Sequence, residues 1–560
     1  MKKTFSILST IALVVMGMAV PSCSKIQDVP VPDDSVSFSL SVSRGEGTKA
    51  LAESGKNLAK TFAENDRIAV VYLMGGETKV AESAALQSDK IENEGKRATF
   101  NITLEGTPDE DSAMKIIYPS SLANADGSVN YAALATQDGT LDYIAANLDL
   151  GLYEGTLSGT TLPTGVALTN PLVIAKFTVK NSVGGADMTA DVTQMVISDG
   201  TSIYTATPTS SQSPVWVAMN PVTAGTIELY AAKGKDLYKK TVSNVTLGAN
   251  KLYPIQVTMA KVDGAVSGFF STNAKGDKMY FSQGNLQYAQ SSSTWSFMEN
   301  QFSTVETYYQ NVGDNYADQN IVSIFGWGTS GINHGAACYQ PTSTSETTGD
   351  YYAYGYSTYS LYSSDGKADW GYNRISNGGN TQNAGWHTPT AAEWNYILGR
   401  RRASTLNGVN NARYAKACLL GSIHGVILFP DHYNHPAGVA LPTGINDERD
   451  TSWNANQYSS ADWAQMEAAG CVFLPAAGNR IGKTMFEVDS YGEYWSSSSY
   501  DSAHASIITF RPNSVNYDTD HCSPKYFGYS VRLAKDVKLT TSQPKTDNLN
   551  AVGGENFIWD

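Results

Sequence analysis

The residues that could do chemistry are few and scattered. The loop Asp431-His432-Tyr433-Asn434-His435 brings two imidazoles near one carboxylate. Two histidines and one carboxylate in a loop are weak evidence for a metal site, so we expect a solvated loop and no bound metal. Gly478-Asn479-Arg480 is interpreted as a turn. No phosphate-binding loop and no Ser-His-Asp pattern stands out, so we expect no cofactor and no enzymatic activity.

Cysteine spacing gives no reactive pair either. Four cysteines follow residue 23, in neither a zinc pattern nor a CxxC pair: Cys338, Cys418, Cys471 and Cys522. One or two disulfides are compatible with an exported protein, and the sequence does not pair them.

Composition limits the class of protein. The chain has 560 residues, 41% of them hydrophobic and 16% charged, with 32 Tyr and a net charge of -14. The hydrophobic content is enough for packed cores, and no basic stripe that would bind nucleic acid is present. A chain of this length contains more than one domain.

The first residues have the pattern of an export signal. Lys2 and Lys3 precede an apolar run from Phe5 to Val20, and Val20-Pro21-Ser22-Cys23 follows. This resembles a bacterial lipoprotein signal, although the usual Leu is replaced by Val20. We expect residues 1–22 to be removed, Cys23 to carry lipid, and residues 23–34 to form an extended tether. An ordinary secretory signal is the alternative.

Strand patterns dominate residues 35–260. Val36, Phe38, Leu40 and Val42 alternate with serines up to Arg44, which predicts a half-buried strand. Further short β-type runs are separated by Gly, Asp and Pro turns, which favours β-sandwiches: Arg67–Tyr72, Ala98–Leu104, Met114–Tyr118, Leu172–Val179, Thr226–Tyr230 and Lys251–Thr258.

Four short motifs in this half resemble the fimbrillin-like pilins of Bacteroidales: Thr61–Ile68, Ile117–Pro119, Ala175–Val179 and Gly248–Tyr253. The resemblance implies two tandem β-sandwiches and assembly by donor-strand exchange with other pilin subunits. In that scheme an arginine-directed protease cuts at Arg44. The lost apolar side chains, each contributing roughly 1.5–3 kcal/mol on burial, leave a groove for a neighbour's strand. The alternative is that the strand stays in place.

The sequence pattern changes after a predicted linker at 261–268. The run Thr390 to Arg401 predicts a helix, with a capping box from Thr390 to Glu393 and an apolar face of Trp394, Ile397 and Leu398. Residues 269–534 resemble the C-type-lectin fold in its bacterial form, shared with the formylglycine-generating enzyme, through Thr388–Trp394, Phe473–Gly478, Tyr494–Ser497 and Ser530–Leu533. The resemblance implies an α+β domain with Trp394 and Trp495 in the core. Residues 535–560 form a tail that is either a donor strand or an extension.

Segment 496–530 lies where some members of this lectin family are rewritten by a diversity-generating retroelement. Mutating both adenines of an AAC codon never yields Lys, Glu, Gln, Met or Trp, and from Ser496 to Ser530 the one such residue is Lys525. Ile508, Phe510 and Val515 are predicted framework, and Tyr529–Leu533 is a predicted strand.

The remaining polar and aromatic positions suit an adaptable binding face. The predicted ligand-binding residues are Ser499, Tyr500, Asp501, Ala503, His504, Ser506, Ile507, Thr509, Arg511, Asn513, Tyr517, Asp518, Asp520, His521 and Phe527.

The combined prediction is a mainly β protein at the cell surface, on the outer membrane or in a pilus. We expect a tip or minor pilin that binds a glycan, a host or bacterial protein, or a phage, and no nucleic acid. One alternative is a surface lipoprotein receptor that does not polymerise. The other is an enzyme like the formylglycine-generating one, which would need closely placed reactive cysteines. Cys471 and Cys522 do not provide that spacing.

Overall fold

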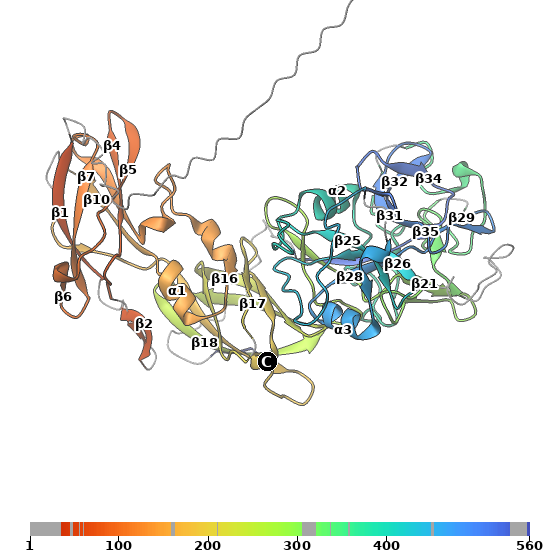
Figure 1. Cartoon of the computed structure of the whole chain (residues 1–560), viewed down its shortest axis with the longest axis horizontal. Coiled ribbons are helices and arrows are strands. Elements are labelled where there is room, and N and C mark those ends of the chain that lie inside the picture. The colour runs from red at the N-terminus through yellow and green to blue at the C-terminus, as the bar shows by residue number, and fades with distance from the viewer. Residues whose placement is uncertain are drawn as a thin grey trace, which may run out of the picture.

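The computed structural model describes residues 35–44, 49–54, 57–59, 61–157, 163–209, 211–304, 321–335, 338–356, 359–363, 365–449, 453–537 and 557–559. The predicted signal peptide, Cys23 and the tether lie outside these residues. The fold is mainly β, as predicted. Three parts, here called domains 1, 2 and 3, follow one another along the long axis (Figure 1).

Domain 1 packs two sheets around one core that includes Leu40, Val42 and Phe100. One sheet has the order β11-β1-β7-β6: β1 Val36–Ser43, β6 Ile91–Glu92, β7 Arg97–Leu104 and β11 Val166–Ala167. The other has the order β10-β8-β4-β5: β4 Ala69–Met74, β5 Glu77–Glu82, β8 Ser112–Tyr118 and β10 Gly151–Leu157. A separate hairpin joins β2 Lys49–Ser54 to β3 Asn57–Ala59.

The first strand is half-buried, as its alternation predicts. β1 pairs along its whole length with β7 but touches β11 at Val42 and Ser43 alone. Its serines face out, while Leu40 and Val42 are buried and Phe38 is partly buried.

Arg44, at the end of this strand, is buried rather than presented to a protease. It is 2% exposed, forms an ion pair with Asp149 at 3.2 Å, and lies 3.7 Å from the ring centroid of Tyr118. Cutting after Arg44 therefore requires this end of β1 to open first.

Domain 2 is built from one long sheet around a second core that includes Ile174, Phe177 and Leu229. Its order is β15-β12-β18-β17-β16-β13-β14-β9, with strands β9 Thr136–Gln137, β12 Val173–Asn181, β13 Gln194–Ser198, β14 Ile203–Ala206, β15 Val215–Met219, β16 Val222–Lys233, β17 Asp236–Leu247 and β18 Lys251–Lys261. Two residue pairs hold β17 to β18, and the strand β37 Phe557–Trp559 pairs with β18 beside them, at Ile255 to Val257.

Domain 3 holds several small sheets. The central one has the order β24-β35-β31-β32-β33, with β34 also on β32: β24 Ile324–Phe325, β31 Gly492–Ser499, β32 His504–Arg511, β33 Ser514–Asn516, β34 Cys522–Pro524 and β35 Tyr529–Ser530. A second has the order β27-β25-β26-β28: β25 Tyr414–Leu419, β26 Ile423–Leu428, β27 Gln457–Tyr458 and β28 Val472–Pro475.

The other strands of domain 3 form short ribbons. These are β19 Phe270–Ser271, β20 Lys278–Phe281 and β36 Ala534–Val537; β21 Leu286–Ala289, β22 Thr294–Phe297 and β23 Ile321–Val322; and the hairpin β29 Asn479–Ile481 with β30 Thr484–Phe486.

The predicted helix exists with its predicted cap. α2, Ala391–Asn395, carries the Thr390–Glu393 capping box and continues as a wider π-helical turn, Tyr396–Arg400. Trp394, like Trp495, is fully buried, as predicted. Two helices were not predicted: α1 Leu141–Asn147 and α3 Ser460–Ala468, the latter with a capping box from Ser459 to Asp462.

Short 3-10 turns complete the described structure: η1 Ser88–Lys90, η2 Ser120–Leu122, η3 Tyr131–Ala135, η4 Thr189–Asp191, η7 Thr348–Asp350, η8 Trp370–Tyr372 and η10 Trp453–Ala455. Within the described ranges, none of the helices combines the length and apolarity needed to span a bilayer.

Three boundaries differ from prediction. The expected linker 261–268 is packed, since Ala265 bridges to Ser282 and Val266 is buried. The tail was predicted to begin at residue 535, but β36 extends to Val537 and pairs with β20. The expected strand Tyr529–Leu533 stops at Ser530, because the chain there leaves the central sheet to join the ribbon of β20.

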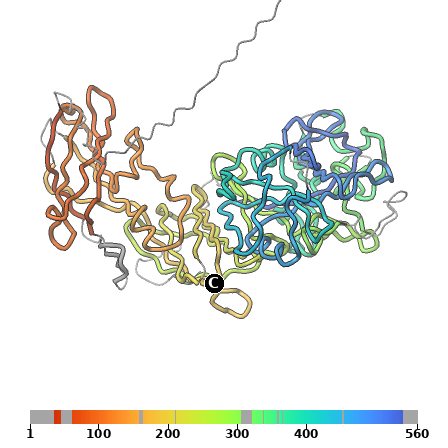
Figure 2. Tube along the Cα trace, in the orientation of Figure 1, coloured from red at the N-terminus to blue at the C-terminus, as the bar shows by residue number. Residues whose placement is uncertain are grey.

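Domains 2 and 3 share a core. Tyr230 of β16 lies 5.7 Å from Phe269 and 5.9 Å from Tyr280 between ring centroids, and Leu237 joins the same cluster. Domain 3 is thus packed on domain 2, and its strands β31, β32 and β29 lie at the end away from domain 1 (Figure 1). Figure 2 shows strands β31 to β35, in dark blue, in this part of domain 3.

Candidate ligand-binding site

A pocket of about 410 Å³ opens beside the central sheet of domain 3. Strands β31 and β32 contribute its floor, the β29–β30 hairpin one wall, and the β34–β35 region the other. The lining residues are Asn479, Ile481, Phe486, Glu487, Glu493, Ile507, Thr509, Arg511, His521, Cys522, Ser523, Phe527 and Tyr529.

Strand register explains which side chains face the pocket. Glu493 pairs with Thr509, and Trp495 pairs with Ile507, so the four share one face of the sheet. Trp495 belongs to the core, Ile507 belongs to the core and also borders the pocket, and Glu493 and Thr509 reach the pocket. The same face therefore changes from apolar core to polar floor within two residues.

Buried acidity is the main electrostatic feature of this floor. Glu493 is 5% exposed and accepts a 2.6 Å hydrogen bond from Asn479 Nδ2, which also donates to Glu487 at 3.3 Å. Burial, with some repulsion from Glu487, raises the pKa of Glu493 to about 7. At neutral pH this carboxyl is both a donor and an acceptor for a bound ligand.

Arg511 and His521 add nitrogen-containing side chains to the pocket lining. The Arg511 guanidinium stands 4.0 Å from the ring centroid of Tyr491, and His521 Nε2 lies 3.1 Å from Thr509 Oγ1. Burial, reinforced by Arg511, lowers the pKa of His521, so the imidazole is neutral near pH 7.

Aromatic rings line both walls of the pocket. Phe527 lies 6.0 Å from Tyr529 between ring centroids, and the Tyr529 hydroxyl is 2.6 Å from Ser523 Oγ. Phe486 stands 43% exposed on the hairpin wall. The pocket thus combines apolar rings with donors and acceptors, the composition of a site for a polar organic ligand.

Fourteen of the fifteen predicted binding residues separate into three groups, and the fifteenth, Ser506, is buried outside the pocket. Five line the pocket: Ile507, Thr509, Arg511, His521 and Phe527. Four are exposed elsewhere: Tyr500, Asn513, Asp518 and Asp520. Five others are half-buried outside it: Ser499, Asp501, Ala503, His504 and Tyr517.

Exposure was predicted wrongly at three positions. Ser506, Ile507 and Thr509 are 2%, 4% and 4% exposed. They lie in β32, an interior strand with β31 on one edge and β33 and β34 on the other. Both faces of β32 pack against a core, since Ala505 and Ile507 belong to one buried cluster and Ile508 and Phe510 to another. Ile508, Phe510 and Val515 are buried, which confirms them as framework.

Two of the half-buried groups have structural partners. Asp501 accepts hydrogen bonds from the backbone N–H groups of Ala503 and His504, each at 2.7 Å, and closes the β31–β32 turn. The Tyr517 hydroxyl donates to Glu448 at 2.7 Å. These contacts hold the segment in place before β32 and after β33.

Lys525 is scaffold. It is fully buried, its Nζ donates to the Ala353 carbonyl at 3.2 Å, and it lies 4.8 Å from the ring centroid of Trp327. Burial lowers its pKa to about 8. The residue that departs from the composition of its segment is thus part of the packing.

Several lining residues escaped prediction. Asn479 was placed in a turn but lies in β29, after Gly478 with φ +74°. Glu493 could have been identified from the sequence, because it is a carboxylate directly before the apolar Tyr494-Trp495. An acid buried in a strand needs a polar partner, which indicates a site. Phe486, Glu487 and Tyr529 had no such signal.

The loop at 431–435 is not the solvated loop expected. Asp431 is 4% exposed and binds Lys278 and Arg401, each at 2.8 Å. His435 Nδ1 lies 3.0 Å from the Tyr433 hydroxyl. Cys338, Cys418, Cys471 and Cys522 are free thiols.

A Glu493→Gln variant is expected to be more stable than the natural chain at pH 8, by on the order of 3 kcal/mol, and nearly equal near pH 4.5. The folded carboxyl binds its proton up to about pH 7, whereas the unfolded one releases it near pH 4.5. The folded state therefore loses stability as pH rises through this window, and Gln removes that loss. Urea unfolding at both pH values measures it, with exposed Glu299→Gln as the control; equal curves at pH 8 would contradict the assignment.

Comparisons with known proteins give limited likeness. No family model matches the chain, and no curated protein matches it. Among solved structures, it is similar to a fimbrial assembly protein from Parabacteroides distasonis, at 13% identity over 44% of this chain and 96% of that one, with a TM-score of 0.23. A protein from Bacteroides uniformis, provisionally described as a cell adhesion protein, matches at 14% over 40% and 97%, with a TM-score of 0.25. A fimbrial protein from Bacteroides ovatus matches at 10% over 85% and 95%, with a TM-score of 0.17.

Proposed function

We propose that this chain is a cell-surface adhesin, a tip or minor pilin subunit, that binds its ligand in the pocket of domain 3. The observation that carries the proposal is the convergence of Ile507, Thr509, Arg511, His521 and Phe527 on one pocket whose frame is buried. Rigid strands position the side chains while their chemistry stays free to vary, as recognition requires.

The arrangement of the domains supports presentation of this pocket. β29, β31 and β32 lie at the end opposite domain 1, which follows the predicted lipid anchor (Figure 1). β1 contacts β7 along its length and β11 at two residues, so its removal would leave an apolar groove next to β7 for a partner strand. β37 pairs with β18 of the same chain, which suits a subunit that accepts a strand and donates none.

The proposed adhesion is tested with fluorescent beads that carry the whole chain, applied to printed oligosaccharides and extracellular-matrix proteins. Arg511→Ala and Phe527→Ala are expected to weaken retention roughly 30-fold, the effect of losing a contact of about 2 kcal/mol. Leu441→Ala removes an exposed apolar side chain outside the pocket and serves as the control. Binding that survives both pocket variants, or no binding to any printed ligand, contradicts the proposal; loss in Tyr500→Ala alone would move the site to the β31–β32 turn.

We further propose that segment 496–530 is diversified by a retroelement. Burial of Lys525 supports this, because a fixed framework residue is free of the codon restriction. The test is to sequence the locus in many sibling isolates and to search nearby for a near-copy of the codons for Tyr494 to Leu533. Differences confined to template adenines are expected; an identical segment everywhere would contradict it.

A second candidate is a surface lipoprotein receptor that keeps β1 and does not polymerise. The burial of Arg44 with Asp149 favours it, since a buried arginine resists proteolysis. N-terminal sequencing of the protein taken from cells separates the two: a start at Gly45 supports the pilin, and a start at Cys23 the receptor. An oxidase role finds little support, because Cys471 is fully buried and burial raises the pKa of its thiol.

A further inference from the structure

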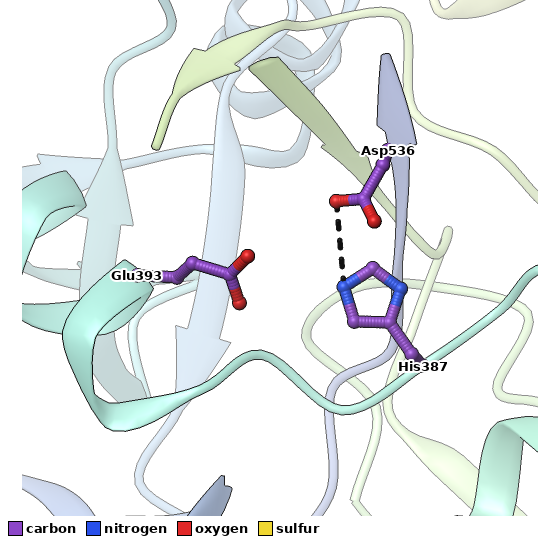
Figure 3. Close-up of side chains that lie close together, drawn as sticks. All are labelled: His387, Glu393 and Asp536. Atoms are coloured by element: carbon purple, nitrogen blue, oxygen red, sulfur yellow. Dashed lines mark ion pairs between the residues drawn. The ribbon is translucent and has the colours of Figure 1, made fainter. Parts of the chain in front are cut away.

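A second cluster of side chains lies in domain 3, and none of its residues lines the pocket. His387 precedes α2, Glu393 lies within α2, and Asp536 lies in β36. One nitrogen or oxygen atom from each falls within 4.8 Å of the others, and all three side chains are partly buried. Figure 3 shows the Glu393 carboxylate facing the His387–Asp536 pair from the opposite side.

The spacing within this cluster suits a shared cation. His387 Nε2 and Asp536 Oδ1 are 3.5 Å apart, long for a hydrogen bond. Two ligands bound at about 2.1 Å to a tetrahedral ion lie roughly 3.4 Å apart, close to the observed value. Glu393 completes the set after a movement on the order of 1 Å, within the reach of a carboxylate.

Each of the three groups is held from outside the cluster. One Glu393 oxygen, Oε2, accepts the capping bonds from Thr390, which leaves Oε1 for a ligand. The backbone of His387 exchanges two hydrogen bonds with Ala534, and β36 pairs with β20. The ligands are therefore ordered without a metal, which reduces the entropy cost of binding one.

The charges of the cluster also favour a bound cation. Two carboxylates face one imidazole, and buried Asp369 lies close enough to His387 to act on it electrostatically. One imidazole nitrogen and two carboxylate oxygens form a donor set for zinc or manganese rather than for calcium or magnesium, which take oxygen alone.

We propose that His387, Glu393 and Asp536 bind one divalent transition-metal ion, with Zn²⁺ bound more tightly than Mn²⁺ and water in the open position. The ion would join the start of α2 to the last strand of domain 3 and so close a loop of roughly 150 residues, where a crosslink restricts the unfolded chain strongly. It would hold β36 against the core that contacts domain 2.

The experiment is a calorimetric titration of the whole chain, tag-free and stripped of metal, with Zn²⁺ alone. One ion per chain is expected, together with a rise in the melting temperature. His387→Gln and Asp536→Asn should each weaken binding at least tenfold. Glu393→Gln should also weaken it while keeping α2, because glutamine serves in a capping box. His424→Gln is the matched control, since His424 pairs with a single carboxylate, Asp489, at 3.1 Å.

Each result decides the proposal. Equal Zn²⁺ binding by His387→Gln and the natural chain overturns it, as does equal affinity for Ca²⁺. In a parallel titration with Co²⁺, thiolate charge-transfer absorption would assign the ion to a cysteine and overturn it too. If Asp536→Asn fails to fold, the titrations of His387→Gln and Glu393→Gln still decide the outcome.

Discussion

An Asp431→Ala variant is expected to lose about 3–5 kcal/mol of the free energy of unfolding of domain 3, one of the two largest effects we expect from one substitution. Asp431 is 4% exposed and stands between Lys278 and Arg401, with Ser271 Oγ donating to it at 2.5 Å. Burial opposes its ionisation, but Lys278 and Arg401 outweigh burial and hold the pKa of Asp431 below its usual value. Removing the carboxylate leaves two buried cations without their shared anion.

Urea unfolding followed by tryptophan fluorescence measures this loss. Asp489→Ala, which breaks a half-exposed pair with His424, should cost less than about 1 kcal/mol and serves as the control. The contribution of Asp431 should be present above about pH 4 and decline as pH falls toward its lowered folded pKa. A loss below about 1 kcal/mol in Asp431→Ala would show that the charges find other partners.

An Asp149→Ala variant is expected to be cut after Arg44 by an arginine-specific protease at least about 100-fold faster than the natural chain. Arg44 is 2% exposed, paired with Asp149 and placed over the rings of Phe62 and Tyr118. Breaking a buried pair costs about 3–5 kcal/mol. When opening is fast, cleavage follows the population of the open state, which rises tenfold for each ~1.4 kcal/mol.

The measurement is the rate at which a fragment beginning at Gly45 appears, by mass spectrometry. Glu82→Ala is the matched control, because it breaks the exposed pair with Arg67, at 3.3 Å and 44% and 54% side-chain exposure. An unchanged rate in Asp149→Ala would mean that the ion pair does not limit access to Arg44. That result would also remove the physical argument for the receptor that keeps β1.

Local patterns predicted much of the secondary structure. The alternation before Arg44 predicted β1, and the six predicted runs correspond to β4, β7, β8, β12, β16 and β18. The spacing of Thr390 and Glu393 predicted the start of α2. α3 was missed although Ser459 and Asp462 form the same cap, because its apolar face is weak and Asp replaces the usual Glu.

The sequence alone predicted part of the candidate site. Segment 496–530 was singled out, and five of the binding residues predicted in it line the pocket. The β29–β30 hairpin and Glu493 were not singled out, and Ser506, Ile507 and Thr509 were wrongly predicted to be exposed. Alternation shows which residues share a face of a strand, but not whether a second layer covers that face.

The chain itself thus specifies what depends on neighbours within a few residues: strand alternation, the Thr390–Glu393 capping box and the apolar helix face that contains Trp394. Tertiary structure decides what depends on residues far apart: Arg44 with Asp149, Lys278 with Asp431, and His387 with Asp536. Strand period and capping are short-range geometry, whereas these contacts follow from sheet register and from which surfaces become buried together. Burial then alters the charge of the groups it encloses, as for Glu493, so the chemistry of both proposed sites exists only in the folded chain.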